Sequence, residues 1–339
     1  MKKGLFVLVV FLMVVGVLSL SWAADKPIVL KWANYAPKTE LDPQAITVQW
    51  FANQWEKRTN GRVKVVIYWG GTLAGIMEVP WAVRDGVGDI GTLITPYFPD
   101  HFPLNDVGGF VVPMRLTTLE LGQTMFSLHE KYPQYVKEFT EKNLKCIGFR
   151  PLESYGLLSK KPIRKLADMK GMKVRNIGAG WVPFITAAGG IPVSISTPEM
   201  YEAMERGVLD ASPIGITLAN RWKIDRVAKY FSFPLGAIMG HCLIMNLKSF
   251  NNLPPDIQTI TMKLGRDYLD EWVRTLDIQV EKVKEIWKKT GVEIVPITPE
   301  DLKKTTDNDL VRAIYKDWIN RARAKGVPDP EKIIQPFIP

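Results

Sequence analysis

The sequence contains few of the residues with which enzymes and metal proteins build reactive sites. Its 339 residues include three histidines and two cysteines, Cys146 and Cys242. The cysteines lack C-x-x-C spacing and are too few for a disulfide scaffold, and the sequence leaves open whether they pair. Patterns typical of zinc peptidases, serine hydrolases and P-loop nucleotidases are also absent. We therefore expect a protein that is not an enzyme and that needs no metal and no cofactor.

Long hydrophobic runs are absent after the N-terminal region. That region combines Lys2 and Lys3 with an apolar run over residues 5–20 and a small-residue cleavage pattern that ends at Ala23. These features predict a secretory signal peptide, and the apolar run is shorter than the ~20 residues that span a bilayer. We expect cleavage after Ala23 and a periplasmic protein that is not itself embedded in the membrane.

Blocks of charge of one sign are absent as well. The formal net charge is +9, but lysines and arginines are scattered, which favours small anionic partners and disfavours nucleic acid. Residues 86–91 match G-x-G-x-x-G, the fingerprint of dinucleotide binding. Here the pattern follows a predicted helix and precedes a predicted strand, which is the reverse of the order that a dinucleotide fold needs. We therefore do not expect a nicotinamide cofactor.

What the chain does contain is an alternation of strand and helix patterns, which predicts an α/β fold. A strand over 28–34 is followed by a helix with apolar residues at three- and four-residue spacing, and then by a strand over 63–68. This β-α-β order implies a parallel strand pair. A short helix over 78–84 and a strand over 89–95 continue the pattern.

The alternation begins again after residue 149, which suggests a second lobe. Strands over 172–175 and 192–195 flank a helix through Phe184, and Ser196 and Glu199 form the capping box of the next helix. Helical patterns also cover 254–290 and 313–324. A chain of this length suits two lobes better than one small core.

Arg175 is the candidate anchor for a small anion. It ends an apolar strand, and the loop that follows carries Gly178 and Gly180, which let backbone approach a ligand closely. A guanidinium presents paired donors that match a carboxylate. On this evidence alone, a surface or interlobe ion pair is the better explanation of a lone arginine.

Three motifs together identify a family. Residues 166–175 (LADMKGMKVR) resemble the L-x-D-x-K-G-x-K-x-R signature of the DctP-type solute-binding proteins of tripartite ATP-independent periplasmic (TRAP) transporters. Residues 189–210 are similar to the family's G-A-x-P-V, E-x-Y-x-A-L and G-x-x-D block, and residues 250–258 to its W-x-x-L-P-x-x-x-Q element. The resemblance covers the chain after the signal peptide in order.

This resemblance implies a two-lobed periplasmic binding protein clamp, with discontinuous lobes joined by strands and a long helix. Lobe I is expected over 24–150 and about 236–275, and lobe II over about 151–235 and 276–339. The partners that it implies are a small organic carboxylate and the TRAP membrane subunits. The family arginine that pairs with the ligand carboxylate falls on Arg175.

Departures from the family pattern indicate the kind of ligand. Members that bind sugar acids carry a second arginine twenty residues before the signature arginine, where this chain has Tyr155. The same alignment predicts further wall residues, and the loops add two tryptophans and a nearby arginine: Ile76, Ile94, Tyr97, Thr197, Ile214, Asn34, Trp69, Trp181 and Arg150. One expected cation and largely apolar walls favour a monocarboxylate with an apolar or aromatic body.

Alternatives remain at this point. A short 2-oxo or hydroxy acid would satisfy the same arginine while touching fewer wall residues. A sensory protein could use the same clamp. An exported enzyme would need a nucleophile and a base close together in the cleft, and the sequence offers no such pair.

Overall fold

The computed structural model describes residues 26–110, 114–178 and 180–338. The predicted signal peptide, residues 1–23, lies outside the described residues. None of the helices in the described ranges is both long and apolar enough to cross a membrane.

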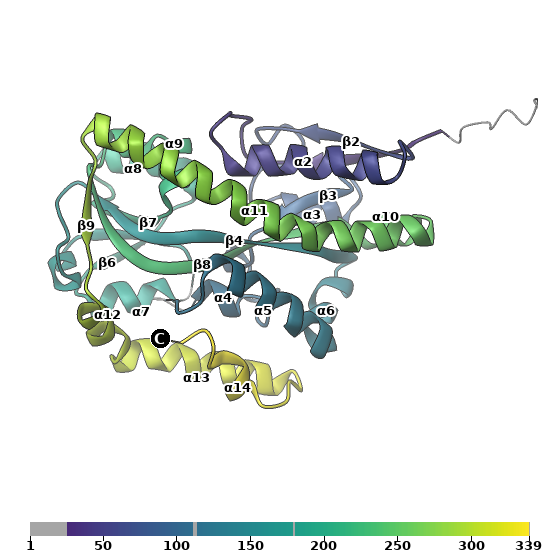
Figure 1. Cartoon of the computed structure of the whole chain (residues 1–339). Coiled ribbons are helices and arrows are strands. Elements are labelled where there is room, and N and C mark those ends of the chain that lie inside the picture. The colour runs from purple at the N-terminus through teal and green to yellow at the C-terminus, as the bar shows by residue number, and fades with distance from the viewer. Residues whose placement is uncertain (1–25, 111–113, 179, 339) are drawn as a thin grey trace, which may run out of the picture.

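One mixed sheet of nine strands runs through the molecule (Figure 1). The strands are β1 Ile28–Ala33, β2 Val63–Tyr68, β3 Ile90–Leu93, β4 Leu144–Ser159, β5 Lys173–Asn176, β6 Ile191–Ser194, β7 Ala211–Ile214, β8 Tyr230–Asn246 and β9 Glu293–Pro296. Their order is β2-β1-β3-β8-β4-β7-β5-β6, and β9 pairs with β8. β1 is parallel to β2 and β3, and β5 is parallel to β6 and β7. The predicted α/β class and the parallel first pair are confirmed.

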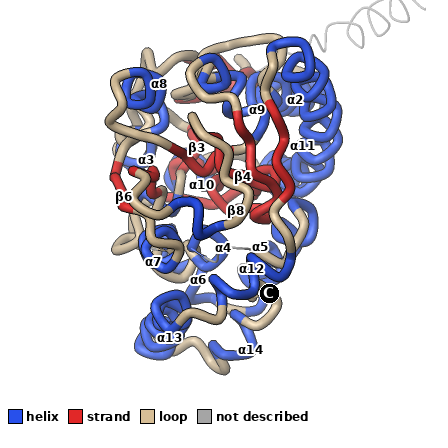
Figure 2. The backbone as a smooth tube through the Cα atoms, turned by 90° about the vertical axis from the view of Figure 1, so that its left-hand side faces the viewer, coloured by secondary structure: helices blue, strands red, loops and turns tan. Residues whose placement is uncertain are grey.

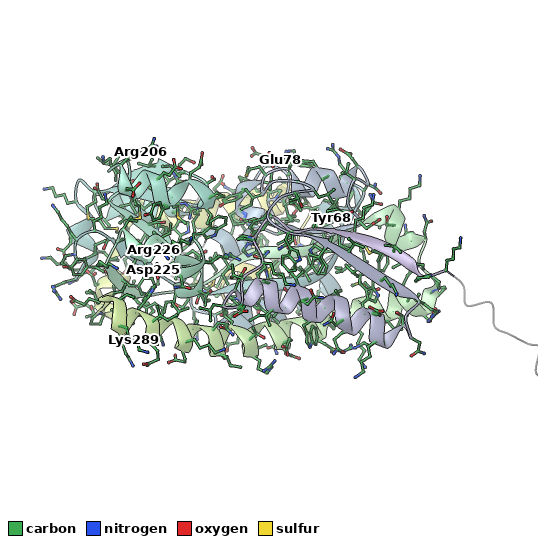
Figure 3. All side chains as sticks on the ribbon, turned by 90° about the horizontal axis from the view of Figure 1, so that it is seen from above. Tyr68, Glu78, Arg206, Asp225, Arg226 and Lys289 are labelled. Carbon is green, nitrogen blue, oxygen red and sulfur yellow. The ribbon has the colours of Figure 1, made fainter. Side chains whose placement is uncertain are left out.

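The two longest strands, β4 and β8, connect the two ends of this sheet. They run antiparallel from the pair Leu144 and Asn246 to the pair Ser159 and Tyr230. β3 pairs with the C-terminal part of β8, whereas β7 pairs with the C-terminal part of β4. The molecule therefore has two halves. Figure 3 shows them from above, with Glu78 in one half and Arg206 in the other.

Helices cover both faces of the sheet (Figures 1 and 2). On one face lie α2 Pro43–Arg58 and α11 Pro255–Thr290, and on the other α4 Val107–Phe110, α5 Thr118–Lys131, α6 Pro133–Thr140 and α7 Trp181–Ala187. The remaining helices are α3 Val79–Arg84, α8 Met200–Glu205, α9 Ile216–Arg221, α10 Leu247–Asn251, α12 Pro299–Thr306, α13 Asp309–Ala324 and α14 Pro330–Ile334. Short 3-10 helices are η1 Thr95–Tyr97, η2 Leu166–Met169, η3 Thr197–Glu199 and η4 Ile224–Arg226.

The helix α11 is a single element of 36 residues that runs along both halves (Figure 1). It begins with Pro255 in its first turn and ends where Gly291 adopts a φ of 75°, a left-handed conformation that glycine accepts without strain. It packs against α2, β4 and α9. Trp272 anchors it to β4, because its indole Nε1 donates to the carbonyl of Pro151 at 2.5 Å.

The C-terminal helices contact a part of the chain that we expected in lobe I. Trp318 of α13 is buried and donates from Nε1 to the carbonyl of Pro103 at 3.1 Å. Gln134 of α6 donates to the carbonyl of Gly326 at 2.8 Å. The expected division placed 276–339 in lobe II, but α13 packs against this region as well as against α7. The indole of Trp318 and the other apolar residues of α13 bury their surface there.

The two cysteines lie on neighbouring strands, and both thiols are free. Cys146 of β4 is in register with Ile244, and Cys242 of β8 is in register with Phe149. Burial raises the pKa of the Cys242 thiol well above its usual range, so this sulfur stays protonated and packs as an apolar group.

Candidate functional site

A narrow cavity lies where the two halves of the molecule meet. One half contributes the loop after β1 and residues around β3 and η1, the other contributes β5, η3 and α9, and the long strands β4 and β8 pass beside both. The space open to the centre of a water-sized sphere is about 40 Å³. The lining residues are Tyr35, Ile76, Ile94, Pro96, Tyr97, Leu152, Tyr155, Arg175, Ile177, Thr197, Leu218, Arg221, Trp222, Ile238 and His241.

Arg175 brings a buried positive charge to this cavity. It lies in β5 and is 2% exposed. Its Nε donates to the carbonyl of Ile195 at 2.7 Å, and its Nη2 donates to the hydroxyls of Tyr97 at 3.1 Å and Thr197 at 3.0 Å. Within the described ranges no carboxylate forms an ion pair with Arg175, and its Nη1 has no hydrogen-bond partner. Because an unpaired buried charge is costly, an anion in the cavity would be stabilised at this point.

Two hydroxyl groups bond this guanidinium, and Tyr155 contributes a third hydroxyl to the same cavity. The hydroxyls of Tyr97 and Thr197 bond each other at 3.0 Å, across the two halves. Tyr155 of β4 is 5% exposed, and its hydroxyl makes no hydrogen bond to another described residue. Burial raises the pKa of Tyr155, although the charge of Arg175 opposes this, so the phenol remains protonated and able to donate.

The rest of the wall is largely apolar. Seven aliphatic side chains and an indole line the cavity: Ile76, Ile94, Pro96, Leu152, Ile177, Leu218, Ile238 and Trp222. Such a surface gains from contact with hydrocarbon or an aromatic ring, and its aliphatic side chains offer no partners to hydroxyl groups.

Arg221 is a second cation at the cavity, but it is already neutralised. Its Nη1 donates to Asp42 at 2.7 Å and to Gln44 at 2.9 Å, and the side chains of Arg221 and Asp42 are 3% and 2% exposed. Asp42 also caps α2, because its carboxylate accepts from the backbone N–H of Gln44 at 3.0 Å. A ligand at this wall therefore meets a bound ion pair rather than a free charge.

The helix α9, which carries Leu218 and Arg221 to the cavity, is fixed by a buried carboxylate of β4. Glu153 accepts from the backbone N–H of Thr217 at 2.8 Å and from its hydroxyl at 2.6 Å. Burial raises the pKa of Glu153 to about 7, while the hydrogen bonds from Thr217 oppose this increase. These bonds position the helix that carries Arg221.

His241 completes the polar part of the wall as a neutral imidazole. Its Nε2 lies 3.1 Å from the hydroxyl of Tyr35. Burial lowers its pKa well below the usual value, and the charges of Arg150 and Arg221 act in the same direction. Arg150 is in register with His241 on the neighbouring strand, and its guanidinium stacks on Trp272 at 4.9 Å. Arg150 thus adds positive potential without lining the cavity.

Of the eleven predicted site residues, the structure brings six together around this cavity and places five elsewhere. Those that line it are Arg175, Tyr155, Tyr97, Thr197, Ile94 and Ile76. Ile214 is buried in the core, in register with Gly156, and Trp181 packs edge-on against Phe184.

The other three outside the lining make contacts of their own, although Nε and Nη2 of Arg150 are buried without a hydrogen-bond partner in the described part of the chain. Asn34 accepts from the side chain of Gln44 at 2.8 Å and donates to the carbonyl of Ala36. Trp69 lies under the ammonium of Lys38 at 5.8 Å. Arg150 stacks on Trp272, as described above.

The sequence did not point to several residues of the wall, above all Tyr35, Arg221 and His241. Arg221 and its partner Asp42 are 179 positions apart in the sequence, so no local pattern predicts the pair. The only local signal is that Asp42 stands before Pro43 as a helix cap.

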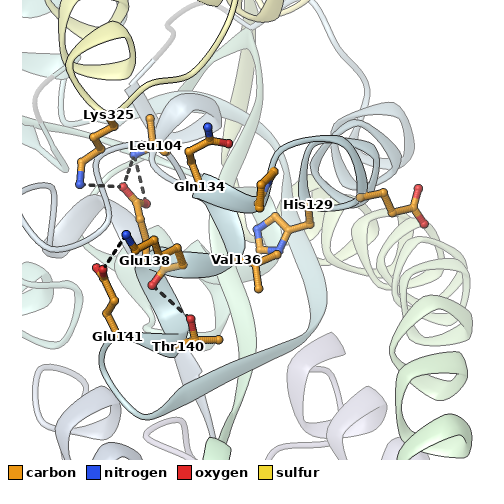
Figure 4. A pocket seen from close by; sticks show the side chains of 11 residues that line it. Leu104, His129, Gln134, Val136, Glu138, Thr140, Glu141 and Lys325 are labelled. Atoms are coloured by element: carbon orange, nitrogen blue, oxygen red, sulfur yellow. Dashed lines mark hydrogen bonds and ion pairs between the residues drawn. The ribbon is translucent and has the colours of Figure 1, made fainter.

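A larger groove is lined by residues of α5 and α6, and charged side chains in it interact with one another (Figure 4). Its lining includes Glu138 of α6, whose carboxylate accepts from the backbone N–H groups of Leu104 and Asn105 and from the Asn105 side chain at 2.9 Å. Lys325 lies 3.7 Å from the same carboxylate. Because these charges already have partners, the groove lacks the unpaired cation that marks the interlobe cavity.

Among the described residues, no group of three or more His, Cys, Asp or Glu side chains is placed to hold a metal ion.

Comparison with known proteins gives matches over most of the chain. Residues 34–320 match the family described as bacterial extracellular solute-binding protein, family 7 (DctP). A curated relative, the 2,3-diketo-L-gulonate-binding periplasmic protein YiaO of Escherichia coli K12, is 24% identical over 279 residues, which are 79% of this chain and 81% of the relative.

Two solved structures extend the match over nearly the whole fold. A TRAP periplasmic solute-binding protein from Desulfovibrio salexigens DSM2638, an open complex, has a TM-score of 0.76 and 25% identity, covering 92% of this chain and 94% of that one. Another from Desulfovibrio salexigens, with bound orotic acid, has a TM-score of 0.78 and 20% identity, covering 91% and 97%. The chain belongs to the bacterial extracellular solute-binding proteins of family 7, the DctP-type solute-binding proteins of TRAP transporters.

Proposed function

We propose that this protein is a periplasmic receptor that binds a small organic monocarboxylate and delivers it to TRAP membrane subunits. The observation that carries the proposal is Arg175, a buried cation that lines the cavity and has no ion-pair partner among the described residues. A ligand carboxylate at Nη1 and Nη2 would supply the missing negative charge. Tyr97 and Thr197 hold the guanidinium in place for this contact.

The walls favour a ligand whose body is apolar or aromatic. A sugar acid in this cavity would lose hydrogen bonds to water at each hydroxyl that faces an aliphatic side chain, at ~1–3 kcal/mol per unpaired group. An aromatic ring or branched chain would gain ~0.8 kcal/mol per buried CH₂ group on the same surface. The narrowness of the cavity supports a second candidate within the class, a short 2-oxo or hydroxy acid.

A thermal-shift screen tests the ligand class. Bound ligand raises apparent stability, by about 2.7 kcal/mol when its concentration is 100 times the Kd. We expect phenylacetate, indole-3-acetate and branched-chain monocarboxylates to give larger shifts than gluconate, sialate or C4-dicarboxylates. Larger shifts with the sugar acids or dicarboxylates would contradict the proposed ligand class while leaving the family assignment intact.

We further propose that the two halves close around the ligand by a hinge movement at β4 and β8. This proposal rests on the position of Arg175 and Tyr97, whose side chains come from different halves and bond across the cavity. A saturating monocarboxylate should therefore reduce the radius of gyration measured by small-angle X-ray scattering. An identical scattering profile with and without bound ligand would count against a hinge movement.

A further inference from the structure

We propose that the ligand carries, besides its carboxylate, a second polar group. This group is uncharged and forms hydrogen bonds with Tyr155 and Arg221. This inference rests on the proposed function, because it assumes that Arg175 binds the carboxylate. It adds a chemical requirement at a different place on the wall. The ligand class becomes a monocarboxylate with an apolar frame and one neutral polar group, such as a ring carbonyl or a phenol.

Tyr155 provides the first part of the argument. It lines the cavity, it is 5% exposed, and its hydroxyl has no hydrogen-bond partner among the described residues. A buried phenol usually finds a partner, because an unsatisfied hydroxyl costs free energy. The neighbouring wall residues Leu152 and Ile238 cannot accept a hydrogen bond from their side chains. The ligand is the partner that the site lacks.

Tyr155 lines the same cavity as Arg175, Tyr35 and Arg221. Arg175 already has the hydroxyls of Tyr97 and Thr197 beside it. The Tyr155 hydroxyl bonds neither Arg175 nor Arg221, so it remains available to a ligand group.

Arg221 provides the second part. Its Nη1 is used by Asp42 and Gln44, whereas its Nε is buried without a partner. No hydrogen bond to a described residue involves its Nη2. The guanidinium can therefore donate to one more acceptor in the cavity. An acceptor on the ligand would satisfy this donor without disturbing the ion pair with Asp42.

The charges at this wall argue for a neutral group. The carboxylate of Asp42 lies 2.7 Å from Arg221 and already balances it, so a second ligand carboxylate would approach a like charge. His241 adds no positive charge because it is held neutral by burial. Arg150, the other buried cation nearby, does not line the cavity. A neutral acceptor meets donors here without repulsion.

Matched ligand pairs test this inference by isothermal titration calorimetry. One pair is pyroglutamate and cyclopentanecarboxylate, and another is 4-hydroxyphenylacetate and phenylacetate, each differing by the neutral polar group. The dicarboxylate 4-carboxyphenylacetate is the charged comparison. We expect the wild-type protein to bind the polar member of at least one pair at least tenfold more tightly than its apolar partner, and to bind the dicarboxylate more weakly than that polar member.

The variant Tyr155→Phe removes the hydroxyl and keeps the ring. It should reduce the preference for the polar member to within threefold. Tyr315→Phe is the matched control, because the Tyr315 hydroxyl is buried without a partner among the described residues and lies in α13, outside the cavity lining. This control should keep the wild-type preference. The wild-type comparison tests the inference by itself if Tyr155→Phe fails to fold.

The outcomes separate this inference from the proposed function. Binding of both members with equal affinity, or a preference that survives in Tyr155→Phe, would overturn the inference alone. Tightest binding of the dicarboxylate would also overturn it. Binding of none of the monocarboxylates would contradict the proposed function, and the inference would fall with it.

Discussion

Replacement of Arg175 by alanine is expected to abolish detectable ligand binding while the protein remains folded. The ligand carboxylate would lose its paired donors inside a desolvated cavity, and truncating one partner of such a charge pair costs ~2–5 kcal/mol. This corresponds to a loss of affinity of about 30-fold to several thousand-fold. Calorimetry with the monocarboxylate that gives the largest thermal shift measures the effect.

Two further variants test whether the loss of binding is caused by the loss of the Arg175 guanidinium. Arg175→Lys should also bind poorly, because an ammonium cannot reproduce the fork that donates to Ile195, Tyr97 and Thr197. Arg274→Ala, which removes an exposed arginine on α11, should bind as the wild type does. An affinity of Arg175→Ala within threefold of wild type would remove this residue from the site.

Replacement of Gly265 by alanine is expected to destabilise the protein strongly, although alanine is the better helix former. Gly265 lies in α11, and a Cβ atom there would fall 1.6 Å from the carbonyl oxygen of Ile147 in β4. The opposing Gly148 also lies close to the helix backbone, with 3.1 Å from its hypothetical Cβ to the Gly265 oxygen. The helix and the strand therefore touch through their backbones, and neither side can yield as a flexible side chain would.

The direction of the stability change shows whether this backbone contact or helix propensity dominates at Gly265. Propensity alone predicts that Gly→Ala stabilises a helix by about 1 kcal/mol, whereas overpacking typically costs 1–3 kcal/mol and occasionally more. We expect Gly265→Ala to lower the Tm by roughly 5 °C or more. Lys263→Ala, at an exposed position of the same helix, should change stability by no more than about 0.5 kcal/mol. An unchanged or raised Tm for Gly265→Ala would contradict the close packing of α11 on β4.

Local signals in the sequence predict the first β-α-β unit and several helix boundaries well. Strand β2 occupies the predicted residues 63–68, and the predicted capping box of Ser196 and Glu199 is present. These features depend on neighbouring residues, so a pattern within a few positions is sufficient. The long helix after Pro254 follows from the same kind of periodicity.

The long strands show where local patterns fail. The apolar runs at 144–149 and 241–245 predict short strands, but β4 and β8 contain 16 and 17 residues. Pro151 and Glu153 interrupt the apolar pattern of β4, and register shifts between residues 146 and 157 accommodate the irregular stretch. Irregular strands of this kind are stabilised by the partner strand and by the helix above, neither of which a window of sequence contains.

The residues of the site also differ in whether the sequence can locate them. Arg175 and Tyr155 are located through the family resemblance, since a signature fixes their positions in the chain. Arg221 and His241 are not, because each meets its partner, Asp42 or Tyr35, through contacts between distant segments. Ile214 was assigned to the wall by alignment, but in β7 alternate residues face opposite sides, so one position decides whether a side chain meets the cavity or the core.

Native mass spectrometry of the purified protein tests the central claim most directly, because a closed binding protein can retain its ligand. The account predicts that the wild-type protein carries a small molecule with one carboxylate group and an apolar frame, and that Arg175→Ala purified in parallel carries none. A retained sugar acid or dicarboxylate, or a ligand retained equally by Arg175→Ala, would contradict it.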